Sequence, residues 1–107
     1  LKGFFTLLAE KHIHCLAYIT PESPFYRNTN SYGLLGPNRE TGRAIVNLLN
    51  AFQDSTPYFH FYDANQEGNH DYADSEAFNF DHLNGVGAIK FTKRIDAIVD
   101  SILKQHH

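Results

Sequence analysis

The chain has a single cysteine, no long apolar run and no cluster of basic residues. Because Cys15 stands alone among the 107 residues, no disulfide can form within the chain. No apolar stretch approaches the roughly 20 residues that a membrane-spanning helix needs. The apolar stretch 1–9 lacks the basic region and the small-residue cleavage site of a signal peptide.

The charge balance is slightly acidic. Lys and Arg number 9 against 12 Asp and Glu, which gives a formal net charge of −3. Without a basic patch, no nucleic-acid partner is expected. The hydrophobic content of 42% is that of an ordinary globular protein, and the length predicts one domain spanning residues 1–107.

Hydrophobic periodicity predicts two buried strands and three helices. The strands are short apolar or aromatic runs, and the helices carry apolar residues three and four positions apart. In the middle helix this stripe is Ala44, Ile45, Leu48, Leu49 and Phe52. In chain order we expect a helix over 4–11, a strand over 13–20, a helix over 39–54, a strand over 57–63, and a helix over 85–103 capped by Asn84.

Alternation of strands and helices predicts a parallel sheet with helices on both faces, a three-layer α/β/α arrangement. Two strands make a poor sheet, so we expect an upstream segment or a partner chain to complete it. Sites in such sheets lie at the carboxyl ends of the strands, here the long loops 21–38 and 64–84. The first loop carries residues able to wall an acyl or sugar pocket, namely Phe25, Tyr26, Tyr32, Leu34 and Leu35.

The segment at residues 79–88, Asn-Phe-Asp-His-Leu-Asn-Gly-Val-Gly-Ala, is the most informative stretch. It resembles the last sequence block of the SGNH hydrolases, the GDSL-like esterases and acyltransferases. There an Asp-x-x-His element precedes Leu-Asn, Gly-Ala and a C-terminal helix. The Thr-Pro-x-x-Pro turn at residues 20–24 and the strand ending in Asp63 also resemble these proteins.

The resemblance implies a flavodoxin-like three-layer fold, of which this chain is the C-terminal portion. It implies a serine esterase or O-acyltransferase without a cofactor, acting on an ester such as an acetylated carbohydrate, and it favours a cell-envelope location. His82 matches the catalytic general base. Histidine suits this role because imidazole exchanges protons near neutral pH.

Asn79 stands where the family has the Asp that orients this histidine. An Asn side chain can fix the ring by a hydrogen bond, but it does not stabilise the imidazolium, so we expect weaker or altered catalysis. Asp81 is adjacent to His82, and neighbouring side chains diverge, so it substitutes poorly. Asp63 or Asp74 is an alternative orienting group.

The nucleophile is the second departure from the family. No Gly-Asp-Ser block occurs in the chain, and none of Ser23, Ser31, Ser55, Ser75 and Ser101 has its setting. We therefore expect the serine to come from the upstream segment or partner chain. The alternative is a non-catalytic binding or assembly module.

Metal binding gives two rival hypotheses. An EF-hand-like calcium loop over residues 63–74 is one, although its last ligand is Asp instead of Glu, and Asx turns in a solvated acidic loop are favoured over it. A zinc site from His12, His14 and His60 is the other, and it lacks the spacing of a zinc motif. The calcium ligands would be Asp63, Asn65, Glu67, Asp71 and Asp74.

Overall fold

The computed structural model describes residues 1–33 and 36–105. Across these residues, no helix combines the length and the apolar content needed to cross a membrane. The elements follow the predicted order, with short additions in the two long loops. They are α1 (Lys2–Lys11), β1 (Cys15–Ile19), η1 (Pro24–Asn28), α2 (Arg39–Ser55), β2 (Phe59–Asp63), η2 (Gln66–Gly68), η3 (Asp74–Glu76), β3 (Ala77–Asn79), β4 (His82–Leu83) and α3 (Gly85–Gln105).

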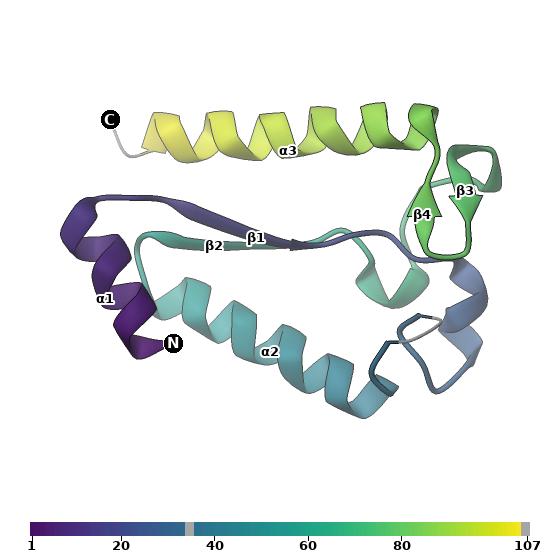
Figure 1. Ribbon diagram of the computed structural model, residues 1–107, viewed down its shortest axis with the longest axis horizontal. Coiled ribbons are helices and arrows are strands. Elements are labelled where there is room, and N and C mark those ends of the chain that lie inside the picture. The colour runs from purple at the N-terminus through teal and green to yellow at the C-terminus, as the bar shows by residue number, and fades with distance from the viewer. Residues whose placement is uncertain (34–35, 106–107) are drawn as a thin grey trace.

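A parallel pair of strands forms the middle of the protein, as the alternating pattern predicted. Cys15 of β1 lies opposite Phe59 of β2, and the register runs to Ile19 opposite Asp63. The helix α3 lies along one face of this pair, and α2 lies along the other (Figure 1). The chain is therefore mixed α/β, with a small parallel sheet between helices.

Aromatic contacts hold the helices to the two faces. The ring of Phe91 in α3 lies 5.3 Å from that of Tyr18 and 6.4 Å from that of Tyr62. On the opposite face, the ring of Phe5 in α1 lies 4.8 Å from Phe52 of α2 and 5.1 Å from Phe59 of β2. Successive side chains of a strand point to opposite faces, so both faces of the sheet are apolar and both take a helix.

The apolar stripe of α2 is wider than the sheet beneath it. Leu49 and Phe52 are half-buried, whereas Ile45 and Leu48 remain 44% and 49% exposed. Only part of the predicted stripe is therefore covered in this structure. A sheet of two strands is too narrow to cover a stripe of this width.

The helix entries are set by asparagine side chains. Asn84 Oδ1 accepts the amide of Gly87 at 3.0 Å, which confirms the predicted cap of α3. Asn38 Oδ1 accepts the amide of Thr41 at 2.8 Å and caps α2 in the same way. Each cap satisfies one amide that has no partner inside its helix.

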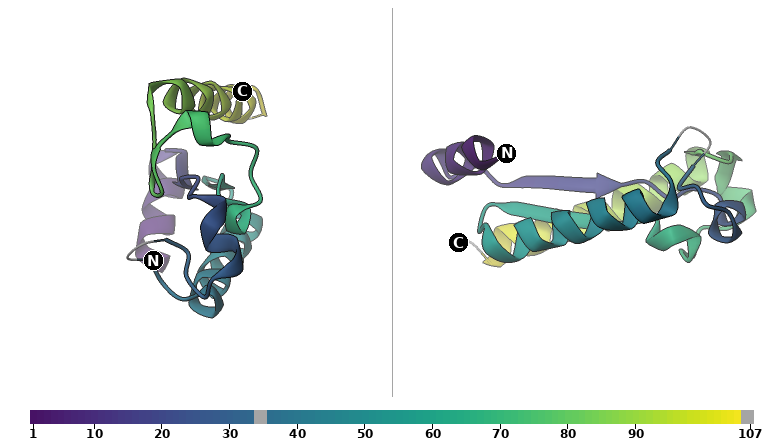
Figure 2. Two further views of the ribbon diagram at one scale, coloured as in Figure 1. Left: turned by 90° about the vertical axis from the view of Figure 1, so that its right-hand side faces the viewer. Right: turned by 90° about the horizontal axis from the view of Figure 1, so that it is seen from below.

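The second long loop contains a hairpin that the sequence analysis did not predict. β3 and β4 pair antiparallel, with Ala77 opposite Leu83 and Asn79 opposite His82. Strands of three and two residues are too short to produce a periodic signal. The hairpin and η1 lie together at the carboxyl ends of β1 and β2, the end of the molecule remote from α1 (Figures 1 and 2).

Candidate functional site

The β3–β4 turn places the His82 ring beside Asn79. The Oδ1 atom of Asn79 accepts the backbone amide of Asp81 at 2.9 Å, and this contact identifies the oxygen as an acceptor. The Nδ1 atom of His82 lies 2.9 Å from the same oxygen, so Nδ1 carries the proton and donates it. In the neutral ring, the lone pair is therefore on Nε2.

His82 lies where two cavities meet. One has a volume of about 600 Å³ and the other about 820 Å³, and both are lined by Pro21, Glu22, His82 and Leu83. A base at this position can reach a group bound on either side. Because the Asn79 amide is neutral, it orients the ring without an ionic contribution.

The Asp81 carboxyl group lies beside that of Glu22. The two carboxyl groups lie against Gly33, where an added Cβ would be 3.3 Å from Asp81 Oδ1 and 3.5 Å from Glu22 Oε2. Burial, the hydrogen bond with Asp81 and the negative charge of Asp81 raise the pKa of Glu22 to about 8. At neutral pH the pair therefore holds one proton. The sequence analysis missed Glu22, although it directly follows the Thr-Pro turn at the end of β1.

The loop after β2 fixes the backbone of Glu22. The backbone amide of Glu22 donates to Oδ1 of Asn65 at 2.8 Å, and Asn65 is only 2% exposed. The carbonyl oxygen of Glu22 accepts from Nε2 of His70, whose Nδ1 accepts the amide of Tyr72 at 3.2 Å. Since Nδ1 of His70 is an acceptor, Nε2 must carry the proton. The loop after β2 thus holds in place a residue that is far from it in the sequence.

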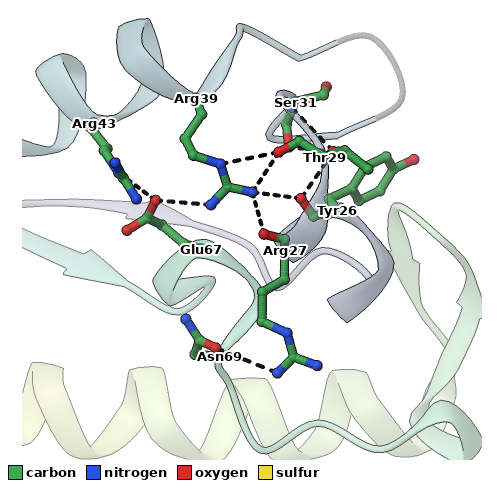
Figure 3. A network of polar contacts seen from close by, with 8 residues as sticks. All are labelled: Tyr26, Arg27, Thr29, Ser31, Arg39, Arg43, Glu67 and Asn69. Atoms are coloured by element: carbon green, nitrogen blue, oxygen red, sulfur yellow. Dashed lines mark hydrogen bonds and ion pairs between the residues drawn. The ribbon is translucent and has the colours of Figure 1, made fainter.

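Arg39 ties the first loop to the body of the protein (Figure 3). Its guanidinium donates to the carbonyl oxygens of Tyr26 at 2.8 Å, Arg27 at 2.6 Å and Thr29 at 2.7 Å. Glu67 accepts from Arg39 at 3.2 Å and from Arg43 at 2.7 Å. The Arg39 guanidinium thus donates hydrogen bonds to the carbonyl oxygens at the end of η1 and positions the segment that carries Tyr26.

The buried Tyr26 hydroxyl faces the acidic pair. Burial, and then the negative charge of Asp81, raise the pKa of Tyr26. Phe25 and Tyr32 of the same loop each line one of the two cavities. Leu34 and Leu35, expected in the same wall, lie outside the described residues.

The structure does not bring the proposed calcium ligands together. Glu67 is directed at Arg39 and Arg43, and Asp71 makes a two-pronged pair with Arg94 at 2.6 Å. Asp63 Oδ1 accepts the amides of Asn65 and Gln66, as in an Asx turn, and is not directed at His82. Asn65 holds Glu22, and Asp74 is exposed at the start of η3.

The histidines at the opposite end of the strands form a pair. His14 Nδ1 lies 2.9 Å from His60 Nε2, and His12 stacks on Tyr58 with ring centroids 5.7 Å apart. Across residues 1–33 and 36–105, no three His, Cys, Asp or Glu side chains are grouped to hold a metal ion. Asp74, the other alternative for orienting His82, does not take that position, because Asn79 Oδ1 is the partner of His82 Nδ1.

Comparison of the chain with protein-family models, with curated proteins and with solved structures gave no match.

Proposed function

We propose that this chain carries the base half of a serine esterase or O-acyltransferase site in an SGNH-type, flavodoxin-like fold, with His82 as the general base. The hydrogen bond from His82 Nδ1 to Asn79 Oδ1 is the observation that carries the proposal. It leaves the lone pair on Nε2, the atom that must receive a proton in such a site. The position of the ring between two cavities gives that atom access to a substrate.

The mechanism needs a serine from another segment or a partner chain. As its Oγ attacks the ester carbonyl, Nε2 of His82 takes the hydroxyl proton. The ring then gives this proton to the departing alcohol, which leaves an acyl-serine. Water, or an acceptor alcohol in a transferase, releases the acyl group by the same steps in reverse. The ester of an acetylated carbohydrate is one substrate of this kind.

The narrow sheet supports the need for such a segment. Ile45 and Leu48 of α2 extend past the two strands and remain exposed. Another strand beside β1 would cover them and would extend the sheet that the helices flank.

Without the serine, Nε2 of His82 can still take a proton from water that attacks an activated ester, so hydrolysis of 4-nitrophenyl acetate by the chain tests the role of His82. We expect slow turnover that His82→Ala reduces at least tenfold and that Asn79→Ala reduces by a smaller factor. His12→Ala is the matched control, because His12 is exposed at the other end of the molecule. Equal rates for His82→Ala and His12→Ala would rule out His82 as the base.

A non-catalytic binding module is the second candidate function, and the surroundings of Ser23 favour it. Among the described residues lining the two cavities, Ser23 is the one serine. Its Oγ accepts the amide of Phe25 at 3.2 Å and caps η1. Labelling with a serine-reactive fluorophosphonate, read by intact mass, separates the alternatives. An adduct on Ser23 would place a nucleophile within the chain.

A further inference from the structure

Three exposed phenylalanine rings border the cavity of about 600 Å³. Phe25 is 61% exposed, Phe78 is 78% exposed and Phe80 is 57% exposed, and all three line the cavity together with His82. Leaving large apolar rings in water is unfavourable, and a cluster of them beside a cavity is typical of a binding surface.

The rings of Phe25, Phe78 and Phe80 form an aromatic wall along this cavity. Contacts between the two long loops position part of this wall. The rings of Phe25 and Phe80 stack with centroids 5.6 Å apart and an interplanar angle of 8°. The amide of Ser23 donates to the carbonyl oxygen of Phe80 at 2.8 Å. Tyr26 meets Phe80 edge to face at 6.3 Å. Phe25 and Phe80 are therefore in place before a ligand arrives, which lowers the entropic cost of binding.

The three phenylalanine rings favour an alkyl chain over a sugar, and the polar side chains of the same cavity, among them Arg27, Asn28 and Asp74, line the rest of it. A phenylalanine ring has no hydrogen-bonding group, whereas sugar recognition needs several donors and acceptors that converge on hydroxyl groups. The rest of the apolar lining is made of Pro21, Pro24, Tyr72, Ala73, Ala77 and Leu83. Glu22 also lines the cavity and is half-buried, and its pKa, raised to about 8 by burial and by Asp81, leaves it largely uncharged at neutral pH.

We infer that this cavity binds the acyl chain of a medium-chain fatty acid or ester along Phe25, Phe78 and Phe80. The carbonyl end lies at His82, and this placement rests on the proposed function. The acyl chain is thus longer than the acetyl group that the sequence resemblance implies. Binding of the chain itself does not require catalysis.

Calorimetric titration of the chain with octanoate, acetate and methyl β-glucoside tests this inference. We expect octanoate to bind at least tenfold more tightly than acetate and methyl β-glucoside to give no measurable heat. Phe78→Ser should weaken octanoate binding about tenfold, because it removes apolar contact area. Phe4→Ser in α1 is the matched control, since Phe4 is also an exposed phenylalanine, at 43%, and should leave the affinity unchanged.

Several outcomes would overturn the inference. Octanoate binding equal to that of acetate, or binding that only methyl β-glucoside shows, would assign the wall to another ligand. An affinity lowered by Phe4→Ser and not by Phe78→Ser would move the site to α1. Since calorimetry is done without turnover, these results are independent of the 4-nitrophenyl acetate test of His82.

Discussion

Asn79 accepts two hydrogen bonds on one oxygen, from the backbone of Asp81 and from the ring of His82, both at 2.9 Å. The backbone amide can only donate, so the first contact determines the direction of the second. A three-residue turn thereby selects one tautomer of the histidine.

This arrangement predicts that the neutral His82 ring carries its proton on Nδ1. A long-range ¹H–¹⁵N correlation spectrum of the ring distinguishes the two tautomers directly. In Asn79→Ala the acceptor is lost, and we expect the Nε2-protonated form to become populated. A wild-type spectrum showing a proton on Nε2 would contradict the base role proposed for that atom.

Because of Glu22, we expect the folded protein to lose stability as the pH rises. Burial, the hydrogen bond to Asp81 and the charge of Asp81 raise its pKa from 4.5 to about 8, so the folded chain keeps a proton that the unfolded chain releases near pH 4.5. The stability that this proton confers is complete below pH 4.5 and falls as the pH rises to about 8. Urea unfolding at steps across this range measures the decline.

Glu22→Gln cannot ionise, and we expect its free energy of unfolding to fall less over the same pH range. Glu10→Gln, an exposed site on α1, is the matched control and should keep the wild-type decline. Parallel pH profiles for wild type and Glu22→Gln would show that Glu22 does not hold the proton in the folded chain.

We expect the Arg39 side chain to contribute strongly to stability through its contacts with one loop. Its side chain is 20% exposed and donates to three carbonyl oxygens, of which that of Tyr26 also accepts from Thr29. We expect Arg39→Ala to lower the free energy of unfolding by about 2–3 kcal/mol in urea denaturation. Arg43→Ala, at a side chain 58% exposed, should cost about 0.5 kcal/mol or less. Equal losses would mean that the carbonyl contacts contribute little.

At Gly87 we expect the usual preference of a helix for alanine over glycine to be reversed. Alanine is normally about 1 kcal/mol better than glycine within a helix, but a Cβ at Gly87 would overlap the carbonyl oxygen of Glu76. Gly87→Ala should therefore destabilise the protein by about 1–2 kcal/mol, as measured by thermal or urea unfolding. Gly3→Ala in α1, where the added Cβ meets no atom within 4 Å, should be neutral or stabilising. A stabilised Gly87→Ala variant would show that α3 can move away from η3.

The main helices and strands could be predicted from the sequence because their signals are local. The five long elements have the predicted types and order, and the Asn84 cap depends on residues within one helical turn. The parallel pairing also follows, since alternating strands and helices leave few other arrangements. The β3–β4 hairpin could not be predicted, because its strands are held by their pairing and not by a pattern of their own.

By itself, the sequence determined the order of the helices and strands. It also identified His82 as the candidate histidine, together with Asn79 three residues before it. The tertiary structure decided which polar side chains meet across long separations. Glu22 reaches Asp81, Arg39 reaches the end of η1, and Glu67 turns to arginines instead of a metal ion. Such contacts depend on how two long loops pack against each other, and no local periodicity or propensity encodes that packing.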